Sequence, residues 1–592
     1  MKSVLPTIFL IALIGMLFEV QIAHGSGTIY IRGNGSIDPS DAPISTFDKI
    51  TYTFTTNIYD AIVIERDNII VDGAGYAIQG TGEGRGMDLS GRNNVTIKNT
   101  DIKGFYFAIY LDGSSHGNIV SGNNVKNNRI GIELYGSGNA ISENSIATND
   151  NGIEIRDCSG NQIFGNTITT NAQTGISLEG NGLAPDRTRD NVVSGNSITE
   201  NYGGVSFGQY SRYNSIIGNN VSGNIWGIEP YGLGHTISGN NIGGNFGGIY
   251  LCGANHTVLE NSIRDNTNRG IFIQSSSGNV LRNNIMVNNT NNLGVEGSGL
   301  SEFIHDIDES NTIDGKPVCY WVNKYDMTIP FNAGYVGIVN SSNVTINQLE
   351  LKNNGEGVLL AYTKNSTIIN NIFLNNSHGI YSRSSSGNNI TQNSMTSNSR
   401  YGIYLDGSHS NNISQNNMTN NMGSGMRFDW SHNNVVSENN IVANKDYGIW
   451  LSQSSDNDIF GNKIENNHGG VRLSKSSDNK FYHNYFTNNT PQVYDEAQDG
   501  WTTYSINIWD DGYPSGGNYW SNYTDIDLYC GPHQNETGSD EIWDHPYIID
   551  GGNRDNYPTV PEFSSLIILP LFVIATLLAV IVNRRKQRKE RH

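Results

Sequence analysis

A segment of 22 to 23 residues is repeated five times between Gly379 and Asn489, and this repeat limits the possible folds more than any other feature. Asn stands at offsets of nine, fourteen and nineteen residues in each copy, as at Asn411, Asn416 and Asn421. A fixed period of this length indicates a repeat architecture, which offers an elongated surface rather than one enclosed pocket. The copies begin at Gly379, Gly402, Gly425, Gly448 and Gly470.

Apolar residues recur between the Asn positions, at offsets one, eleven and sixteen, as at Ile403, Ile413 and Met418. Each stands in a short segment that alternates apolar and polar residues, which is typical of a β-strand. Three strands per copy, separated by turns rich in Asn, Gly and Ser, predict one coil of a parallel β-helix. Equivalent residues of stacked coils would lie about 4.8 Å apart, so identical Asn amides can form a hydrogen-bonded ladder. Asn also tolerates the left-handed backbone that tight corners need.

The same pattern begins near Ala108, and we predict about 17 coils with a length of roughly 80 Å. One coil, between Gly175 and Gly204, carries an insertion. One continuous helix and two separate helices both agree with this arrangement. We expect an N-terminal cap with the first coils over residues 26–107, β-helix repeats over 108–294, an irregular middle segment over 295–345, further repeats over 346–490, and a C-terminal cap over 491–560.

The two ends of the chain carry targeting patterns. Lys2, an apolar run through Leu17 and small residues before Ser26 predict a secretory signal peptide over residues 1–25. Within residues 561–592, the segment 564–582 is apolar and just long enough to span a bilayer as a transmembrane helix. A basic tail follows, so the positive-inside rule places the tail in the cytoplasm. We therefore expect a protein held at the extracellular face of the cell membrane.

The part predicted to lie outside the cell is strongly acidic. Of 36 basic and 56 acidic residues, 29 and 54 remain after the signal peptide and the tail beyond Val582 are set aside, which gives a net charge of −25. Such a surface repels nucleic acid, which we exclude as a partner.

Cysteine and sequon positions bear on covalent chemistry. Cys158 and Cys252 would lie four coils apart, about 19 Å, which is too far for a disulfide, whereas the pairing of Cys319 and Cys530 stays open. In a secreted protein, Asn-x-Ser/Thr sequons are acceptors for N-glycosylation, and we expect some of them to be modified. They include Asn94, Asn220, Asn255, Asn343, Asn389, Asn412, Asn417, Asn522 and Asn535.

The repeat "NNISQNNMTNN", the opening "IVIERDNIIVDGAGYAIQGTG" and the closing "NIWDDGYPSGGNYWSNYTDIDLY" resemble the NosD-like family of right-handed β-helix repeats. Members are also described as carbohydrate-binding and sugar-hydrolysis domains, and the end motifs resemble archaeal surface members. The resemblance implies a single-stranded right-handed parallel β-helix of the pectin-lyase-like class. The tail resembles PEF-type sorting signals of archaea, which implies that an archaeosortase recognises Pro561, Glu562 and Phe563 and exchanges the membrane anchor.

Outward positions of the first strand in each repeat form two columns of candidate functional residues. The column at offset two offers aromatic faces and guanidinium groups for sugar binding. At offset four, Asp406 and Asp429 would stand about 5 Å apart, a separation that suits a retaining glycosidase. Both residues equally suit the start of a turn. In the N-terminal half, Glu133 and Glu154 form a second acidic pair. The carbohydrate-binding candidates are Tyr381, Tyr404, Arg427, Trp450 and Arg472.

Metal sites are weakly indicated. His409 and His432 share a turn position in adjacent coils and could hold a transition metal, but His, Met and Cys are sparse, so the sequence disfavours copper. The closing segment offers carboxylates that suit Ca²⁺, without the spacing of an EF-hand. These calcium candidates are Asp525, Asp527, Asp540 and Asp544.

The sequence favours a non-catalytic protein anchored in the cell envelope, structural or adhesin-like, with a possible carbohydrate-binding face. Its expected partners are the membrane, glycans or envelope proteins, and the sorting transpeptidase. The first alternative is an extracellular polysaccharide hydrolase or lyase that uses Asp406 and Asp429. The second is copper handling, which the scarcity of soft ligands disfavours.

Overall fold

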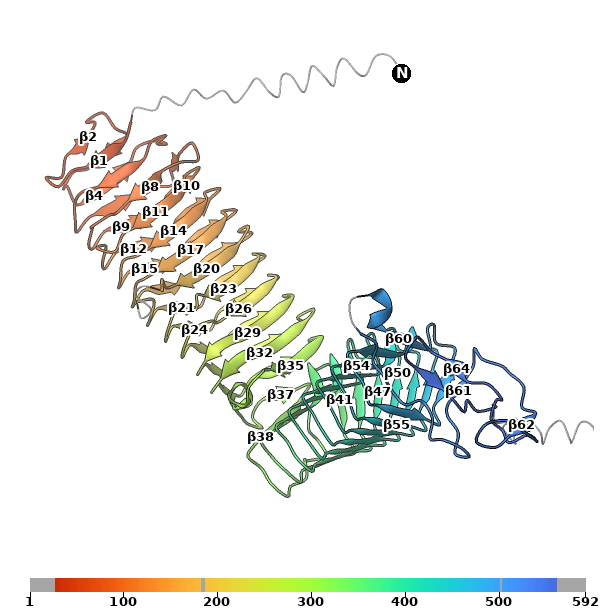
Figure 1. The fold of residues 1–592 in the computed structure, drawn as a ribbon. Coiled ribbons are helices and arrows are strands. Elements are labelled where there is room, and N and C mark those ends of the chain that lie inside the picture. The colour runs from red at the N-terminus through yellow and green to blue at the C-terminus, as the bar shows by residue number, and fades with distance from the viewer. Residues whose placement is uncertain (1–26, 183–186, 501–502, 562–592) are drawn as a thin grey trace, which may run out of the picture. The chain divides into compact units, whose positions relative to one another are not determined.

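The computed structural model describes residues 27–182, 187–500 and 503–561 as an all-β, right-handed parallel β-helix of about 19 turns (Figure 1). There are more turns than predicted because strands outside the Asn repeat also stack into coils. Within these ranges, no helix is long and apolar enough to cross a membrane. The predicted signal peptide, the transmembrane helix over 564–582, Glu562 and Phe563 lie outside the described residues, whereas Pro561 is the last one described.

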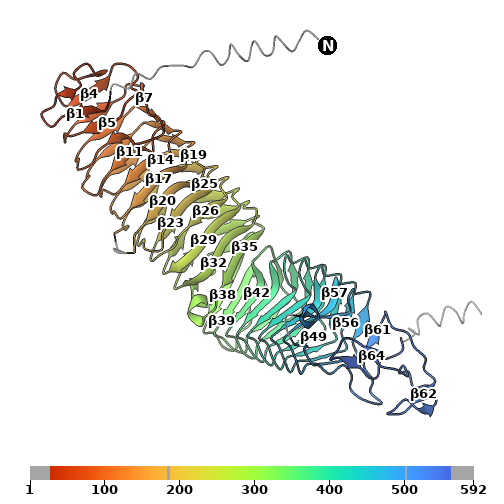
Figure 2. The ribbon, with the colours of Figure 1, turned by 45° about the horizontal axis from the view of Figure 1, so that its top comes forward.

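The chain divides into two compact units. Unit 1 comprises the described residues up to Asn323 with Asn332–Asn340 and Leu351–Leu359, and unit 2 comprises Lys324–Phe331, Ser341–Glu350 and the described residues from Leu360. Each unit is built from stacked coils whose strands pair in parallel with those of the next coil, as Figure 2 shows by the order of the labelled strands.

Sheet 1 of unit 1 has 13 strands, and only its outermost pair, β2 with β1, is antiparallel. A second sheet, from β3 (Ile44–Ser45) to β36 (Asp306–Ile307), also has 13 strands, most of them three residues long. In order, the strands of sheet 1 are β2 (Ile37–Asp38), β1 (Ile29–Ile31), β5 (Ile62–Ile64), β8 (Arg85–Asp88), β11 (Phe107–Leu111), β14 (Ile130–Leu134), β17 (Asn151–Arg156), β20 (Thr174–Glu179), β23 (Gly203–Phe207), β26 (Trp226–Glu229), β29 (Gly247–Ala254), β32 (Arg269–Ser277) and β35 (Asn291–Glu296).

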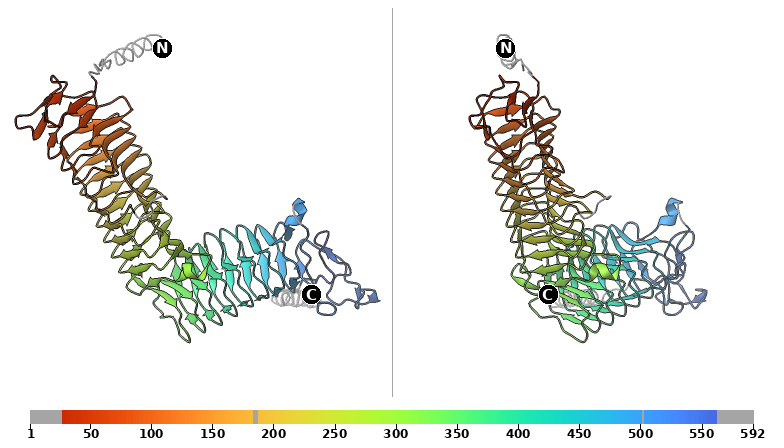
Figure 3. Two further views of the ribbon diagram at one scale, coloured as in Figure 1. Left: turned by 60° about the vertical axis from the view of Figure 1, so that its left-hand side comes forward. Right: turned by 90° about the vertical axis from the view of Figure 1, so that its left-hand side faces the viewer.

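Unit 2 repeats this arrangement, and its coils run from green to blue in Figure 3. A seven-stranded sheet runs from β40 (Thr345–Asn347) to β58 (Lys480–Tyr482). The first position of a coil needs glycine, because a Cβ added to Gly402 would lie 2.6 Å from the carbonyl oxygen of Gly425 in the next coil. Sheet 1 of unit 2 contains, in order, β45 (His378–Arg383), β48 (Ile403–Asp406), β51 (Met426–Asp429), β54 (Tyr447–Ser452), β57 (Gly469–Ser474) and β60 (Val493–Asp495).

The predicted Asn ladders are confirmed. The Nδ2 of Asn411 donates to Oδ1 of Asn434 at 3.0 Å, and the backbone N–H of Asn411 donates to the same oxygen at 2.9 Å. Nδ2 of Asn411 also reaches the carbonyl oxygen of Ser385, so the buried amide is satisfied on both sides. Because a buried polar group without partners costs free energy, the ladder fixes the register of successive coils.

Asn adopts the left-handed backbone at many of these corners, as predicted, for example at Asn420 (φ 56°). This residue is not the ladder Asn but the one before it, and other residues also take that position, as Gln392 (φ 56°) does before Asn393. The ladder Asn can then keep ordinary backbone angles while its amide points inward to its stacked neighbours. Gly fills the same preceding position in other coils, where it adopts a positive φ without steric cost, as at Gly387.

A serine ladder runs beside the Asn ladders of unit 2. The backbone N–H of Ser408 donates to Oγ of Ser431 at 3.0 Å, and the N–H of Ser431 donates to Oγ of Ser454 at 3.0 Å. These hydroxyls are fully buried and also donate to carbonyl oxygens. Each hydroxyl therefore accepts and donates as an Asn amide does, with a smaller side chain.

In unit 1, histidines take over part of an Asn ladder. The N–H of Asn214 donates to Nδ1 of His235 at 3.1 Å, and the N–H of His235 donates to Nδ1 of His256 at 3.3 Å. The Nε2 atoms lie 2.8 Å and 2.7 Å from the carbonyl oxygens of Tyr231 and Cys252, to which they donate. Burial lowers the pKa of His235 to about 3 and that of His256 to about 4. Both rings are therefore neutral and mimic the acceptor and donor of an amide.

The last coil of unit 2 is closed by the segment 503–561. Trp509 stacks on Phe481 with centroids 4.3 Å apart, and Trp520 stacks on Phe486 at 4.4 Å. The last backbone donor of an Asn ladder also finds an acceptor, because the N–H of Asn518 donates to Oδ2 of Asp555 at 2.7 Å. Burial raises the pKa of Asp555 to about 7. The segment thus covers both the apolar core and the polar ladders.

All four cysteines lie within the described residues and are free, which agrees with the prediction that Cys158 and Cys252 do not pair. Cys319 and Cys530 also form no disulfide.

Candidate functional site

The predicted carbohydrate-binding residues form one column on the outer face of sheet 1 of unit 2. The strand register pairs Tyr381 with Tyr404, Tyr404 with Arg427, Arg427 with Trp450, and Trp450 with Arg472. This order is the one that the repeat offsets predict. We call Tyr381, Tyr404, Arg427, Trp450 and Arg472 the aromatic column.

Contacts within the aromatic column are continuous. The rings of Tyr381 and Tyr404 stack with centroids 5.2 Å apart and an interplanar angle of 13°. The guanidinium carbons of Arg427 and Arg472 lie 4.1 Å and 4.2 Å from the Trp450 ring centroid, one from each neighbouring coil. Such cation–π contacts hold both guanidinium groups against the indole.

Tyr381 departs from the expected exposure. Its side chain is only 6% exposed, because the rings of His378 and Tyr404 stack against it. In a β-helix, outward residues of neighbouring coils are close enough to cover one another, so an outward position is not always an accessible one.

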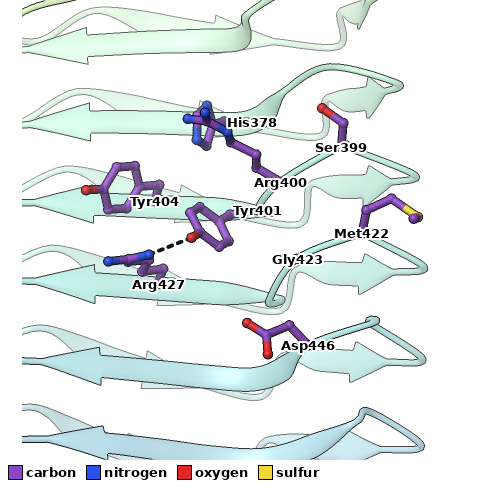
Figure 4. A pocket seen from close by; sticks show the side chains of 9 residues that line it. All are labelled: His378, Ser399, Arg400, Tyr401, Tyr404, Met422, Gly423, Arg427 and Asp446. Carbon is purple, nitrogen blue, oxygen red and sulfur yellow. Dashed lines mark hydrogen bonds between the residues drawn. The ribbon is translucent and has the colours of Figure 1, made fainter.

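An open pocket of 530 Å³ lies at the start of these strands, beside the aromatic column (Figure 4). Tyr401 forms part of its wall, and its hydroxyl accepts a hydrogen bond of 2.6 Å from Nη1 of Arg427. The column contributes only Tyr404 and Arg427 to the wall. The full lining is His378, Ser399, Arg400, Tyr401, Tyr404, Met422, Gly423, Arg427 and Asp446.

Asp429 fixes the position of Arg427 in the pocket. Nε and Nη2 of Arg427 lie 3.0 Å from the Asp429 carboxylate, which also accepts a hydrogen bond of 2.8 Å from the Tyr404 hydroxyl. Asp429 is 5% exposed, so this ion pair is shielded from water. Asp429 therefore positions two pocket residues without lining the pocket itself.

The predicted carboxylate pair is adjacent but enclosed. Asp406 and Asp429 are register partners, and Asp406 is 8% exposed and ion-paired with Arg383. Burial raises the pKa of Asp406 above its usual range, and Arg383 opposes this shift. Neither carboxylate lines the pocket, so the structure separates the acidic pair from the open surface next to it.

Glu133 and Glu154, in β14 and β17 of unit 1, are also register partners. They stand two residues earlier in their coils than Asp406 and Asp429 and align with the position of Tyr404. Arg156 contacts both carboxylates, with Nε 3.4 Å from Oε1 of Glu133. Burial, followed by the charge of Glu154, raises the pKa of Glu133 to about 8. At 1% exposure, Glu133 is closed to any ligand.

The histidine pair does not fit a metal site. The rings of His409 and His432 stack with centroids 5.4 Å apart, as the repeat predicts. However, Nδ1 of His409 accepts from the N–H of His432 at 3.1 Å, and Nδ1 of His432 accepts from the N–H of Ser455 at 3.0 Å. Each neutral ring then carries its proton on Nε2, which leaves no lone pair directed at a metal.

The calcium candidates point toward backbone donors instead of a common centre. Asp527 accepts from the N–H groups of Asp540 and Glu541 at 3.1 Å each, and Asp544 accepts from Tyr529 at 3.0 Å. Asp525 pairs with His545. In residues 27–182, 187–500 and 503–561, no group of three or more His, Cys, Asp or Glu side chains could hold a metal ion.

Sequence reasoning missed most of the pocket. His378, Arg400, Tyr401 and Asp446 lie one or two residues before the Gly that starts a coil, where the repeats differ most from one another. That variability, next to otherwise constant positions, is the only sequence signal that could have marked them.

Two family models match the chain. The periplasmic copper-binding protein (NosD) model matches residues 47–229 and 181–320, and the right-handed beta helix region model matches residues 319–418 and 356–524. The chain is a NosD-like right-handed β-helix protein. Copper appears in the family description, whereas the part of the chain that the structure describes holds no group of three or more His, Cys, Asp or Glu side chains that could hold a metal ion.

Solved structures with a similar fold are distant. DFA-IIIase from Arthrobacter chlorophenolicus A6 is 12% identical with a TM-score of 0.25, and the alignment covers 43% of this chain and 59% of that one. A tailspike protein of E. coli bacteriophage HK620, in complex with a hexasaccharide, is 12% identical with a TM-score of 0.32 and coverages of 55% and 67%. Alginate lyase from Paenibacillus sp. str. FPU-7 is 13% identical with a TM-score of 0.22 and coverages of 40% and 91%. No curated protein matches the chain significantly.

Proposed function

We propose that this NosD-like protein is a non-catalytic carbohydrate-binding protein of the cell envelope, which holds a glycan in the pocket of unit 2. The pocket carries the proposal, because it joins an open cavity of 530 Å³ to the aromatic side chains of Tyr401 and Tyr404. Aromatic faces carry partial negative charge and attract the C–H bonds of a sugar ring, and a few fixed polar groups then select its orientation.

The polar groups of the pocket are held in place before any ligand binds. Arg427 is fixed by Asp429 and by the Tyr401 hydroxyl, and Asp446 accepts a hydrogen bond of 3.0 Å from Ser424. A side chain that is already ordered loses little conformational entropy on binding, so preorganisation of this kind favours affinity.

The proposal includes an extracellular location, which the family description of a periplasmic protein supports. The signal peptide, the anchor over 564–582 and processing by an archaeosortase at Pro561, Glu562 and Phe563 belong to the same proposal. Mass spectrometry of the C-terminus of the protein from its native membrane tests it. A C-terminus near Phe563 is the expected result, and an intact tail ending at His592 would contradict processing.

A glycan array tests the binding function. The purified chain should bind a limited set of glycans, and Tyr401→Ala should weaken that binding about tenfold or more, since it removes one ring face and the acceptor that holds Arg427. Tyr485→Ala is the matched control, because Tyr485 is 39% exposed and lies on another sheet of unit 2. Absence of binding to every glycan, or equal binding by both variants, would refute the proposal.

Asp406 supports a second candidate function, an extracellular polysaccharide hydrolase or lyase. Its pKa is raised by burial, and Asp429 stands next to it, which suits an acid beside a base. Turnover of a bound polysaccharide that disappears in Asp406→Asn, with binding retained, would establish this candidate. Binding without turnover by the unmodified chain would leave the non-catalytic proposal in place.

A further inference from the structure

An exposed aromatic cluster lies where sheet 1 of unit 2 ends, at the corner that follows β48 and β51. Trp430 comes directly after β51 and is 55% exposed. His409 and His432 follow the same two strands, each three residues beyond the strand end, and their rings stack with centroids 5.4 Å apart. We call Trp430, His409 and His432 the corner site.

The members of the corner site lie close together on the outside of the helix. Ser431 is fully buried in the serine ladder, whereas Trp430 and His432 on either side of it contact solvent. Two residues of chain span at most about 7 Å, so the indole and the stacked imidazoles belong to one surface.

The backbone at Trp430 does not favour a tryptophan. Its φ is 48°, in the left-handed region, where a bulky side chain is strained. Gly407 holds the equivalent position of the preceding coil with a φ of 58°, so the corner needs no side chain there. In the part of the chain that the structure describes, the Trp430 indole has no ring, cation or hydrogen-bonding partner. Strain that no contact offsets indicates a functional residue.

The two histidines present hydrogen-bond donors beside the indole. Nδ1 of each ring accepts from a backbone N–H, so the proton of the neutral ring lies on Nε2. His409 is exposed and His432 is half-buried, and neither Nε2 has a partner among the described residues. An uncovered ring beside fixed donors suits a sugar, because its C–H bonds can lie on the ring and its oxygens can accept the hydrogen bonds.

We propose that the corner site is a second subsite for the glycan of unit 2, which runs along the strand direction from the pocket to Trp430. The proposal depends on the glycan binding proposed above, because one chain occupies both sites. Tyr401 stands six positions before Gly407, the equivalent of Trp430, which is roughly 20 Å along a strand. The surface between them is formed by the half-buried side chains of Tyr404 and Arg427. A disaccharide held against Tyr401 is too short to reach the indole, so the ligand is a linear oligosaccharide or polysaccharide.

Calorimetric titrations with oligosaccharides of two lengths test the proposal. The probes are disaccharides and hexasaccharides prepared from cellulose, chitin and alginate, and from any further polymer that the glycan array identifies. We expect at least one hexasaccharide to bind to the full chain. Trp430→Gly should weaken that hexasaccharide about tenfold and leave the corresponding disaccharide unchanged, because only the longer chain reaches the indole.

Three further variants locate the effect. Tyr401→Ala should weaken both lengths, because it alters the pocket. His409→Asn keeps an acceptor for the N–H of His432 but removes the surface donor, and should weaken the hexasaccharide about threefold. The matched control Gln453→Gly alters the same corner position in the next coil and should leave both lengths unchanged.

Thermal unfolding separates a binding role of Trp430 from a structural one. Trp430→Gly should unfold at the same temperature as the unmodified chain or higher, since glycine adopts a positive φ without steric cost. Unchanged hexasaccharide binding in this variant, an equal loss for both lengths, or a lower unfolding temperature would overturn the corner site and leave the pocket in place. Absence of binding by every oligosaccharide would refute the pocket and the corner site together.

Discussion

The outer faces of sheet 1 in unit 1 and in unit 2 are built on the same kind of scaffold, but they differ in how their carboxylates are paired with arginines. Around the pocket of unit 2, carboxylates are matched by arginines, as Asp406 is by Arg383 and Asp429 by Arg427. In unit 1, Glu229 has no described partner, and Glu133 and Glu154 share Arg156. Asn ladders underlie both faces, so the scaffold tolerates either arrangement of charge.

The largest expected effect comes from damage to the shared scaffold. Asn434→Ala should lower the free energy of unfolding by about 4 kcal/mol, because it leaves several buried donors and acceptors without partners at ~1–3 kcal/mol each. Asn434 accepts from Asn411, and its Nδ2 donates to Ser408 and Asn457. Chemical denaturation measures the loss. The exposed neighbour Asn412→Ala is the control, and a similar loss there would show that the ladders are not what holds the coils in register.

A smaller effect distinguishes the histidine segment of the unit 1 ladder from its Asn segments. The folded-state pKa values of about 3 for His235 and about 4 for His256 lie below the usual 6.5. At a pH between the folded-state value and 6.5, the unfolded chain therefore binds more protons than the folded chain does. The contribution of the two neutral rings to the free energy of unfolding should be fully present above about pH 6.5. It should fall as the pH drops toward about 4, by on the order of 3 kcal/mol. The double variant His235→Asn/His256→Asn should lose this dependence in denaturation curves at pH 4.5 and 7.5. An unchanged slope would contradict neutral imidazoles in the ladder.

The contrast between matched and unmatched carboxylates predicts opposite responses to neutralisation. Asp429→Asn should destabilise the chain by about 2 kcal/mol, because it leaves the Arg427 charge poorly compensated in a shielded site. Glu229→Gln should cost less than about 0.5 kcal/mol or stabilise, since no partner is lost. Thermal unfolding of the two variants measures both changes. Equal destabilisation would show that Glu229 has a partner in solution.

The smallest expected effect concerns the protonation of Glu133. Its pKa of about 8 lies above the usual 4.5, so the folded chain binds the extra proton, and this contribution to stability is lost as the pH rises through that range. Glu133→Gln should therefore stabilise the chain by about 1 kcal/mol at pH 9 and change little at pH 5. Asp406→Asn is the comparison, because Arg383 already compensates that carboxylate. A Glu133→Gln variant whose stability changes equally at both pH values would contradict the raised pKa of Glu133.

Much of the scaffold could be predicted because it depends on periodicity. The offsets of Asn411, Asn416 and Asn421 fix three ladders, and the same offsets give the order of the aromatic column. The pocket could not be predicted in this way, since Tyr401 and Asp446 occupy positions where each coil is different. The burial of Tyr381 depends on the rings that neighbouring coils place beside it, and sequence period alone does not report ring orientation. His235 interrupts the Asn period while preserving its hydrogen bonds, which only the geometry reveals.

The cap over the last coil of unit 2 has a consequence for how such a chain can change over generations. The last coil is covered by Trp509, Trp520 and Asp555. Each internal coil contacts only the coils above and below it. Unequal recombination between nearly identical copies could then add or delete whole coils without disturbing either terminus. Each event would change the reach of the unit by one step of about 4.8 Å, so selection could adjust length in fixed increments while the end remains sealed against unwanted polymerisation.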